Sequence, residues 1–157
     1  MLSNLTQVQI SGFIALLVST PFLIKSVRNL YLASASKKWT KLNGTIIEMS
    51  NIGRRYNLKY EYTINRTTYK SHRICFTNSN RRINQSVGEF MEKYAVNRIV
   101  DVFYNPIKPK QAVLEPGKKD GLMLAIIMLS VLFIFGCLAV FNQAFFLELI
   151  NPYFEIQ

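Results

Sequence analysis

Residues that carry most enzyme chemistry are scarce in this chain of 157 residues, which has one histidine and two cysteines. His72 and Cys75 form a His-x-x-Cys pair, but on a strand that spacing directs the two side chains to opposite faces. A zinc site needs three or four protein ligands, and Cys75 has no credible base that could activate it as a nucleophile. We therefore expect no metal site and no cofactor.

Two motifs of acyl and phosphate chemistry are also absent. The sequence has no Gly-x-Ser-x-Gly element, and its glycines are isolated, so no glycine-rich loop can surround a phosphate. Glu61 and Asp101 lie on predicted strands among many basic residues, where ion pairs explain them better than general acid–base catalysis. The sequence thus predicts a protein without catalytic residues, which is not an enzyme.

Charged side chains are missing from residues 1–24 and 121–147, and all 19 Lys and Arg residues lie between Lys25 and Lys119. A helix needs about 20 apolar residues to cross a bilayer, and the segment 121–147 exceeds this length. The segment Ile10–Ile24 reaches it if residues 5–10 are counted, or if Lys25 and Arg28 extend their charged ends toward water. We predict one transmembrane helix over residues 5–36, including a cytoplasmic extension, and a second over 120–147, followed by a short tail over 148–157.

A signal peptide is the alternative interpretation of the first segment, because Ala33-Ser34-Ala35 resembles a cleavage site. However, no basic region precedes the apolar run, and Lys25 and Arg28 separate that run from Ala35. These features favour a retained span.

The basic residues flank the inner sides of the two predicted spans, whereas the outer segments carry only Glu148 and Glu155. Basic residues near span ends are retained on the cytoplasmic side. The middle segment also lacks the paired cysteines that an extracytoplasmic domain of this size often has. We predict a multi-pass protein of the cell inner (plasma) membrane, with both termini outside and a cytoplasmic central domain.

The middle segment, residues 37–118, has the pattern of a basic, β-rich soluble domain. Apolar residues alternate with polar ones along Tyr56–Ile64, which is typical of a half-buried strand. Asn65-Arg66 predicts a tight turn, and Asn43-Gly44 predicts another. Ser86 to Glu89 has capping-box spacing for a short helix that ends near Tyr94. The remaining predicted strands are Thr45–Ile52, Thr67–Phe76, Ile99–Tyr104 and Gln111–Leu114.

The fold class that follows is an α+β membrane protein. Two transmembrane helices flank a small, five-stranded, mainly antiparallel β domain with one short helix. Five short strands in so few residues predict a barrel-like or curled sheet.

Several motifs of the middle segment recur in the order found in one family. They are Trp39, Gly44-Thr45-Ile46, Tyr60-Glu61-Tyr62-Thr63-Ile64, Tyr69-Lys70-Ser71, Val100-Asp101-Val102-Phe103-Tyr104-Asn105-Pro106, Pro109, Ala112-Val113-Leu114 and Glu115-Pro116-Gly117. Over residues 37–120 the chain resembles the bacterial membrane-protein family of the domain of unknown function DUF3592. The resemblance implies this fold with flanking membrane helices, and it transfers no catalytic residue because the family has no established reaction.

The chain departs from the family pattern at two turns. Arg66 stands where a glycine is usual, and Asn97-Arg98 replaces a usual glycine before the fourth predicted strand. These departures bear on the backbone geometry of the two turns more than on the family resemblance.

The excess of basic residues is the strongest functional feature of the middle segment. A basic surface near a membrane attracts anionic lipid headgroups, with about 1 kcal/mol per nearby Lys or Arg. An equally weighted alternative is that the charge only sets topology and solubility. The candidate surface for lipid or a partner comprises Lys37, Lys38, Lys41, Arg54, Arg55, Arg81, Arg82, Lys108, Lys110, Lys118 and Lys119.

Nucleic acid is a less favoured partner. Arg54-Arg55-Tyr56 and Arg81-Arg82 combine cationic and aromatic side chains, as nucleic-acid sites do. The tyrosines, however, alternate as core positions would, and a membrane tether is unusual for that function.

Small residues in the two predicted spans offer a surface for helix packing. Gly12, Ala15 and Ser19 follow one helical stripe, and Gly136 and Ala139 form a weaker match. The stripe could dock the two spans together, or it could reflect a general tolerance of small residues in lipid.

Taken together, these patterns favour a non-catalytic integral membrane protein, a binding or accessory subunit of a membrane complex. Its expected partners are anionic headgroups and a membrane protein or a second copy of the chain. Two alternatives remain open: an immunity-type protein that neutralises a membrane-targeted toxin, and a sensor of anionic lipid surfaces.

Overall fold

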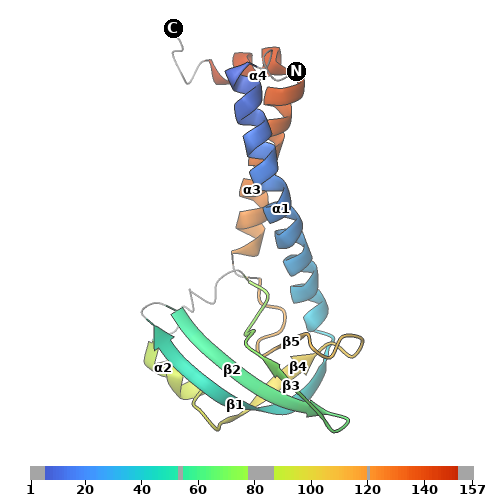
Figure 1. The fold of residues 1–157 in the computed structure, drawn as a ribbon, viewed down its shortest axis with the longest axis vertical. Coiled ribbons are helices and arrows are strands. Elements are labelled where there is room, and N and C mark those ends of the chain that lie inside the picture. Colours follow the sequence, from blue (N-terminus) through green and yellow to red (C-terminus); the bar gives the residue numbers. More distant parts are fainter. Residues whose placement is uncertain (1–5, 53–54, 78–86, 120, 152–157) are drawn as a thin grey trace. The chain divides into compact units, whose positions relative to one another are not determined.

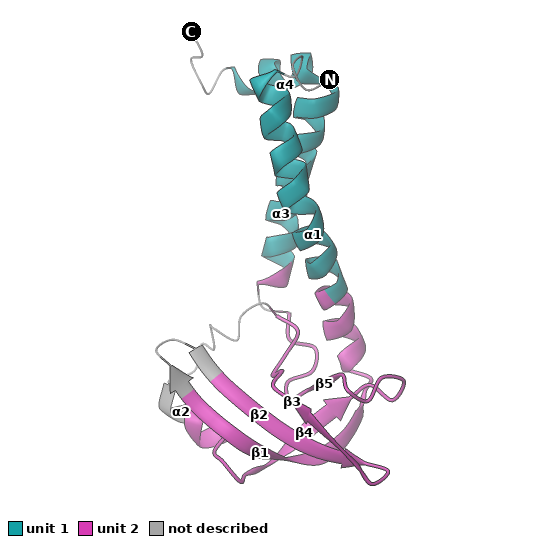
Figure 2. Cartoon of the chain, viewed as in Figure 1, with its two compact units in different colours: residues 1–28, 123–157 teal, residues 29–122 magenta. Residues whose placement is uncertain are grey.

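The computed structural model describes residues 6–52, 55–77, 87–119 and 121–151, and for residues 51–52, 55–56 and 87–89 it describes the backbone only. The chain divides into two units, which Figure 2 colours separately. One unit contains residues 1–28 and 123–157, and the other contains residues 29–122. Each unit is described by itself below.

The first unit is helical. It contains most of α1 (Gln7–Ser36), nearly all of α3 (Leu122–Phe141) and the short helix α4 (Gln143–Ile150). Among the described residues, α1 and α3 are the two helices long and apolar enough to cross a membrane. The helix α1 continues through Pro21, although this residue has no N–H to donate to the preceding turn.

The second apolar segment forms two helices, whereas the sequence predicted one helix over residues 120–147. The helix α3 ends at Phe141, and Asn142 caps the start of α4, because its side-chain oxygen accepts a hydrogen bond from the Phe145 amide at 3.3 Å. Asparagine is a strong N-cap residue, and its side chain competes with the helical hydrogen bonds of the backbone. A single Asn therefore interrupts a segment whose hydropathy pattern is continuous.

The second unit contains a curled five-stranded sheet, as the sequence predicted (Figure 1). All neighbouring strands are antiparallel, in the order β3-β2-β1-β4-β5. The strands are β1 (Thr40–Ile52), β2 (Arg55–Ile64), β3 (Thr67–Ser71), β4 (Ile99–Tyr104) and β5 (Ala112–Val113), and the short helix α2 (Val87–Lys93) precedes β4.

The central strand β1 pairs with β4 along its first half and with β2 along most of its length. Ile46 pairs with Tyr60 and Glu48 pairs with Lys59, so Ile47 is an extra residue in the ladder. Such a β-bulge bends the strand and increases its twist. The bulge therefore accounts for part of the curl of the sheet.

The main core of this unit lies between one face of the sheet and α2. Leu58, Tyr60 and Tyr62 of β2 are buried there, as their alternation in the sequence predicted, together with Phe90 and Tyr94. The ring centroids of Phe90 and Tyr94 are 4.8 Å apart. Burial of large side chains of this kind supplies most of the driving force for folding.

A second, smaller cluster forms on the opposite face of β4 and β5. Val113 and Phe76 are buried in it, beside Phe103 and Trp39, and the rings of Trp39 and Phe76 meet edge to face at 5.5 Å. Because Val102 belongs to the main core and its neighbour Phe103 to this cluster, both faces of β4 are covered.

Two predicted boundaries in the sheet were wrong. Asn43-Gly44 is not a turn but lies inside β1, where Gly44 pairs with both Val100 and Tyr62. The third strand ends at Ser71, not at Phe76. Beyond Ser71 the chain leaves the sheet, and the Ile74 carbonyl accepts hydrogen bonds from the amides of Leu114 (3.0 Å) and Glu115 (2.8 Å) instead. His72 is consequently exposed while Cys75 is buried.

The two turns that depart from the family pattern keep a left-handed backbone. In the β2–β3 turn, Asn65 has φ 47° and Arg66 has φ 65°, and before β4 Asn97 has φ 66°. A two-residue hairpin turn with positive φ at both positions matches the twist of the strands. Asparagine tolerates this conformation, whereas a long side chain such as that of Arg66 adopts it only at a cost.

Replacing Gly44 tests the close packing at the centre of the sheet. A Cβ atom at this position would lie 2.6 Å from Val102 Cγ2 and 2.7 Å from the Glu61 carbonyl oxygen. We expect Gly44→Ala to lower the free energy of unfolding by about 1–3 kcal/mol through this overlap. Urea denaturation measures the change through the fluorescence of Trp39, the single tryptophan.

The control is Asn43→Ala, at the exposed neighbouring position of the same strand. An equal loss of stability in both variants would contradict the steric explanation.

Candidate functional site

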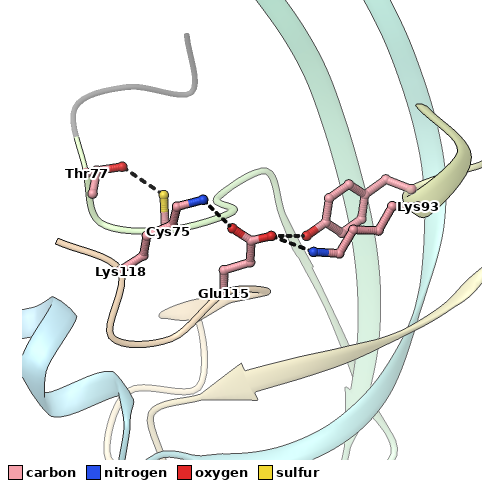
Figure 3. Close-up of polar contacts among 6 residues, drawn as sticks. Cys75, Thr77, Lys93, Glu115 and Lys118 are labelled. Atoms are coloured by element: carbon pink, nitrogen blue, oxygen red, sulfur yellow. Dashed lines mark hydrogen bonds and ion pairs between the residues drawn. The ribbon is translucent and has the colours of Figure 1, made fainter. Parts of the chain in front are cut away.

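The second unit, residues 29–122, is called the β unit below. Its most elaborate polar cluster surrounds the carboxylate of Glu115 (Figure 3). Its Oε1 atom accepts hydrogen bonds from Lys93 Nζ at 2.7 Å and from the Tyr94 hydroxyl at 2.8 Å, and its Oε2 atom accepts one from Lys118 Nζ at 3.0 Å. Lys93 ends α2 and Tyr94 follows it, while Glu115 and Lys118 follow β5. The cluster therefore joins α2 to the segment that leaves the sheet.

The backbone around Glu115 is fixed on both sides. Its own amide donates to the Ile74 carbonyl, and the Gly117 amide donates to Ser36 Oγ at 3.0 Å. Gly117 has φ 76°, and the aliphatic chain of Lys37 occupies the space that a side chain at this position would need. Only glycine meets both requirements without strain. These two hydrogen bonds and the conformation of Gly117 thus fix the backbone that carries the Glu115 carboxylate.

The protonation states of the cluster follow from its contacts. Burial raises the pKa of Glu115, but hydrogen bonds from Lys93, Lys118 and Tyr94 outweigh this effect and lower the pKa to about 2. Burial, and then the neighbouring Glu115 carboxylate, raise the pKa of Tyr94 above its ordinary value. At neutral pH the carboxylate is therefore charged and the phenol is protonated. A carboxylate with three donors is a structural acceptor and a poor base.

A cavity of about 350 Å³ adjoins the cluster and is lined by Lys93, Tyr94, Arg98, Ile99, Val100, Asp101, Phe103, Leu114 and Glu115. Its charged groups are already partnered: Arg98 donates to the Glu92 carbonyl at 2.6 Å, and Asp101 pairs with Lys41 at 2.8 Å. Within the described parts of the chain, no group of three or more His, Cys, Asp or Glu side chains could hold a metal ion. Cys75, behind the cluster, has its Sγ atom 2.9 Å from Thr77 Oγ1.

The predicted basic residues fall into three groups. Lys41 and Lys118 form ion pairs with Asp101 and Glu115. Lys37, Lys38, Lys108 and Lys110 are exposed, and Lys119 is half-buried. Arg54, Arg81 and Arg82 lie outside the described residues, and of Arg55 only the backbone is described, as part of β2.

The small residues of the helical unit lie where α1 and α3 approach each other. A Cβ atom on Gly12 would lie 2.8 Å from Ala139 Cβ and 3.1 Å from the Gly136 carbonyl oxygen. Ala15 is half-buried, and Ser19 is fully buried with no hydrogen-bond partner for its hydroxyl among the described residues. The two glycines therefore permit close contact between the helix backbones.

Comparison with known families identifies the β unit. Residues 42–119 match the model of a domain of unknown function, DUF3592. This segment is a DUF3592 domain. No curated protein and no solved structure matches the chain. The Glu115 cluster thus lies inside the DUF3592 domain, whose family description states no activity.

Sequence reasoning did not single out Glu115 as a functional or structural centre. Two signals were present: the Glu115-Pro116-Gly117 motif of the resemblance, and a lysine three residues after the glutamate. Lys93 and Tyr94 gave no such signal, because only the tertiary fold brings α2 to the end of β5.

Removing the charge of Glu115 tests the cluster. The pKa of Glu115 in the folded chain, about 2, lies below the ordinary value of 4.5, so the carboxylate stabilises the fold above that ordinary value. This stabilisation is lost as the pH falls from about 4.5 to about 2. We expect Glu115→Gln to cost about 1–2 kcal/mol at neutral pH, after allowance for solvent screening of a partly exposed group.

Urea denaturation followed by Trp39 fluorescence, across the acid range, measures this effect. The difference between Glu115→Gln and the unmodified chain should shrink toward zero as the pH approaches 2. Glu92→Gln, at an exposed position of α2, is the matched control and should change little. A pH-independent difference would show that the cluster does not act through the charge of Glu115.

Proposed function

We propose that the chain is a non-catalytic integral membrane protein, an accessory subunit that binds a membrane partner through its DUF3592 domain. The observation that carries this proposal is that both oxygens of the Glu115 carboxylate already accept hydrogen bonds from within the domain. The carboxylate is occupied by Lys93, Tyr94 and Lys118, whereas lysines such as Lys108 and Lys110 are exposed. The domain offers charged surface for binding more readily than a free acid, base or nucleophile.

The membrane location is supported by α1 and α3, which are long and apolar enough to span a bilayer. The close approach of the two helices at Gly12 and Gly136 is typical of packing between membrane helices. We place the protein in the cell inner (plasma) membrane with the DUF3592 domain in the cytoplasm and both termini outside. The distribution of Lys and Arg between the two helices supports this orientation.

The partner is a larger membrane protein or a second copy of the chain. The sequence from Lys25 to Asp120 holds all 19 basic residues against seven acidic ones, which suits a partner with a complementary acidic surface. Nucleic acid is a poorer candidate, because Tyr60 and Tyr62 are buried in the core and offer no surface for base stacking.

Protease protection tests the orientation. In intact spheroplasts, protease added from outside should leave the DUF3592 domain uncut, because the membrane shields it. After the spheroplasts are lysed, the same protease, trypsin, should cleave at exposed sites such as Arg66 or Lys110. Cleavage within the domain before lysis would reverse the proposed orientation.

Native purification tests the accessory role. The full chain, tagged at either end and extracted in mild detergent, should co-purify at fixed stoichiometry with one larger membrane protein or with itself. A chain that purifies alone and as a monomer would contradict the proposal.

A further inference from the structure

One end of the sheet gathers cations from three separate segments of the unit formed by residues 29–122. Thr40, the first residue of β1, pairs with Tyr104, the last residue of β4, so the β4–β5 loop lies beside the residues that enter β1. Gly44 pairs with Tyr62, which places the β2–β3 turn at the same end (Figure 1). We call this region the basic end; its cations are Lys37, Lys38, Lys41, Arg66, Lys108 and Lys110.

Acidic residues are nearly absent from the basic end. The segments 37–47, 62–72 and 102–114, all within the described part of the chain, contain no Asp or Glu. Asp101, which directly precedes the third segment, pairs with Lys41 at 2.8 Å. The other five cations are exposed and form no ion pair with another described residue. Their charge is therefore available to a partner.

An aliphatic side chain projects among these cations. Ile107, in the β4–β5 loop, is 86% exposed and is the most exposed of the large apolar residues described. It lies between Pro106 and Lys108, with Lys110 three residues further on. A lone exposed isoleucine is common, but here it forms the tip of a loop whose other prominent side chains are basic.

The loop that carries Ile107 is held rigid. Asn105 donates its amide to the Gln111 carbonyl at 2.9 Å, and its side-chain oxygen accepts from the Ile107 amide at 2.9 Å. The Tyr62 hydroxyl donates to the Pro109 carbonyl at 2.6 Å, which fastens the loop to β2. Because these bonds fix the backbone, little conformational entropy remains to be lost when the tip binds.

We propose that the basic end, with Ile107 at its tip, binds the surface of a bilayer that contains anionic phospholipids. This inference rests on the membrane location in the proposed function. Lysine and arginine attract anionic headgroups, their aliphatic stems reach along the interface, and an apolar tip enters the boundary of the acyl chains.

Two features favour lipid over an acidic protein as the occupant. Four of the five available cations are lysines, which act as flexible point charges and suit mobile headgroups better than fixed bidentate partners. In addition, Lys37 directly follows α1, which is a candidate membrane span. The chain itself therefore tethers the basic end to the membrane, which raises the effective concentration of lipid headgroups that the cations meet.

The test uses the full chain in vesicles that contain no other protein. A Cys137→Ala background leaves only the buried Cys75, and Ile107→Cys then accepts an environment-sensitive fluorophore. The vesicles are phosphatidylcholine alone, or phosphatidylcholine with a third phosphatidylglycerol, each with a spin-labelled lipid as quencher. Ile99→Cys is the matched control, because Ile99 is also an exposed isoleucine but lies at the opposite end of β4 from the basic end.

We expect the probe at position 107 to shift to the blue and be quenched in the phosphatidylglycerol vesicles, and to lose both effects at high salt. The probe at position 99 should report water in both vesicles. Lys108→Gln with Lys110→Gln should lower the equilibrium for membrane contact by about 25-fold at low salt, or fivefold per charge. Lys59→Gln with Arg98→Gln removes two charges that lie outside the basic end and should have no such effect.

Three results would overturn the inference: no quenching at position 107 in anionic vesicles, equal quenching at positions 107 and 99, or equal quenching with and without phosphatidylglycerol. Shielding of position 107 only when a co-purified protein is added would assign the basic end to an acidic protein instead. Because the vesicles contain no partner, failure here leaves the accessory role to be judged by native purification alone.

Discussion

The β unit depends on the double pairing of β1, which must hold β2 and β4 on its two edges over the same few residues. At Gly44 the backbone pairs with both neighbours, and the space for a side chain is already taken by Val102 and the Glu61 carbonyl. Just beyond, the extra residue Ile47 bends the strand. The close packing at Gly44 and the bulge at Ile47 together curl the sheet, so that β2 and β4 contribute to one core.

The Glu115 cluster holds together the part of the domain in which the pairing between strands is short. The ladder between β4 and β5 is only two residues long, after which the chain turns toward Ile74. Lys93 and Tyr94 then bind the Glu115 carboxylate and connect α2 to this segment. A partly buried charge of this kind is costly unless hydrogen-bond donors satisfy it, and here three donors do so. The polar groups of the Glu115 cluster thus stabilise the fold of the domain.

Local patterns predicted the fold where local forces determine it. The alternation through Leu58, Tyr60 and Tyr62 identified the buried face of β2, and Ile99–Tyr104 was predicted with the bounds that the structure has. Prediction failed where a distant segment decides: Asn43-Gly44 has the composition of a hairpin turn, but strands far along the chain require Gly44 inside β1. The Glu115 cluster was missed for the same reason, and Asn142 was missed because one cap residue outweighs continuous hydropathy.

The charge distribution links architecture to function. Three acids of the described residues form ion pairs with lysines: Glu48 with Lys59, Asp101 with Lys41, and Glu115 with Lys93 and Lys118. The loops at the basic end contain none of these acids, so their cations repel one another and their mutual repulsion opposes folding. An isolated domain would gain stability from a single Asp or Glu in these loops, whereas a domain that meets an anionic surface gains more from leaving them out. The absence of acids from these loops is thus the feature of the sequence on which the proposed binding to an anionic surface rests.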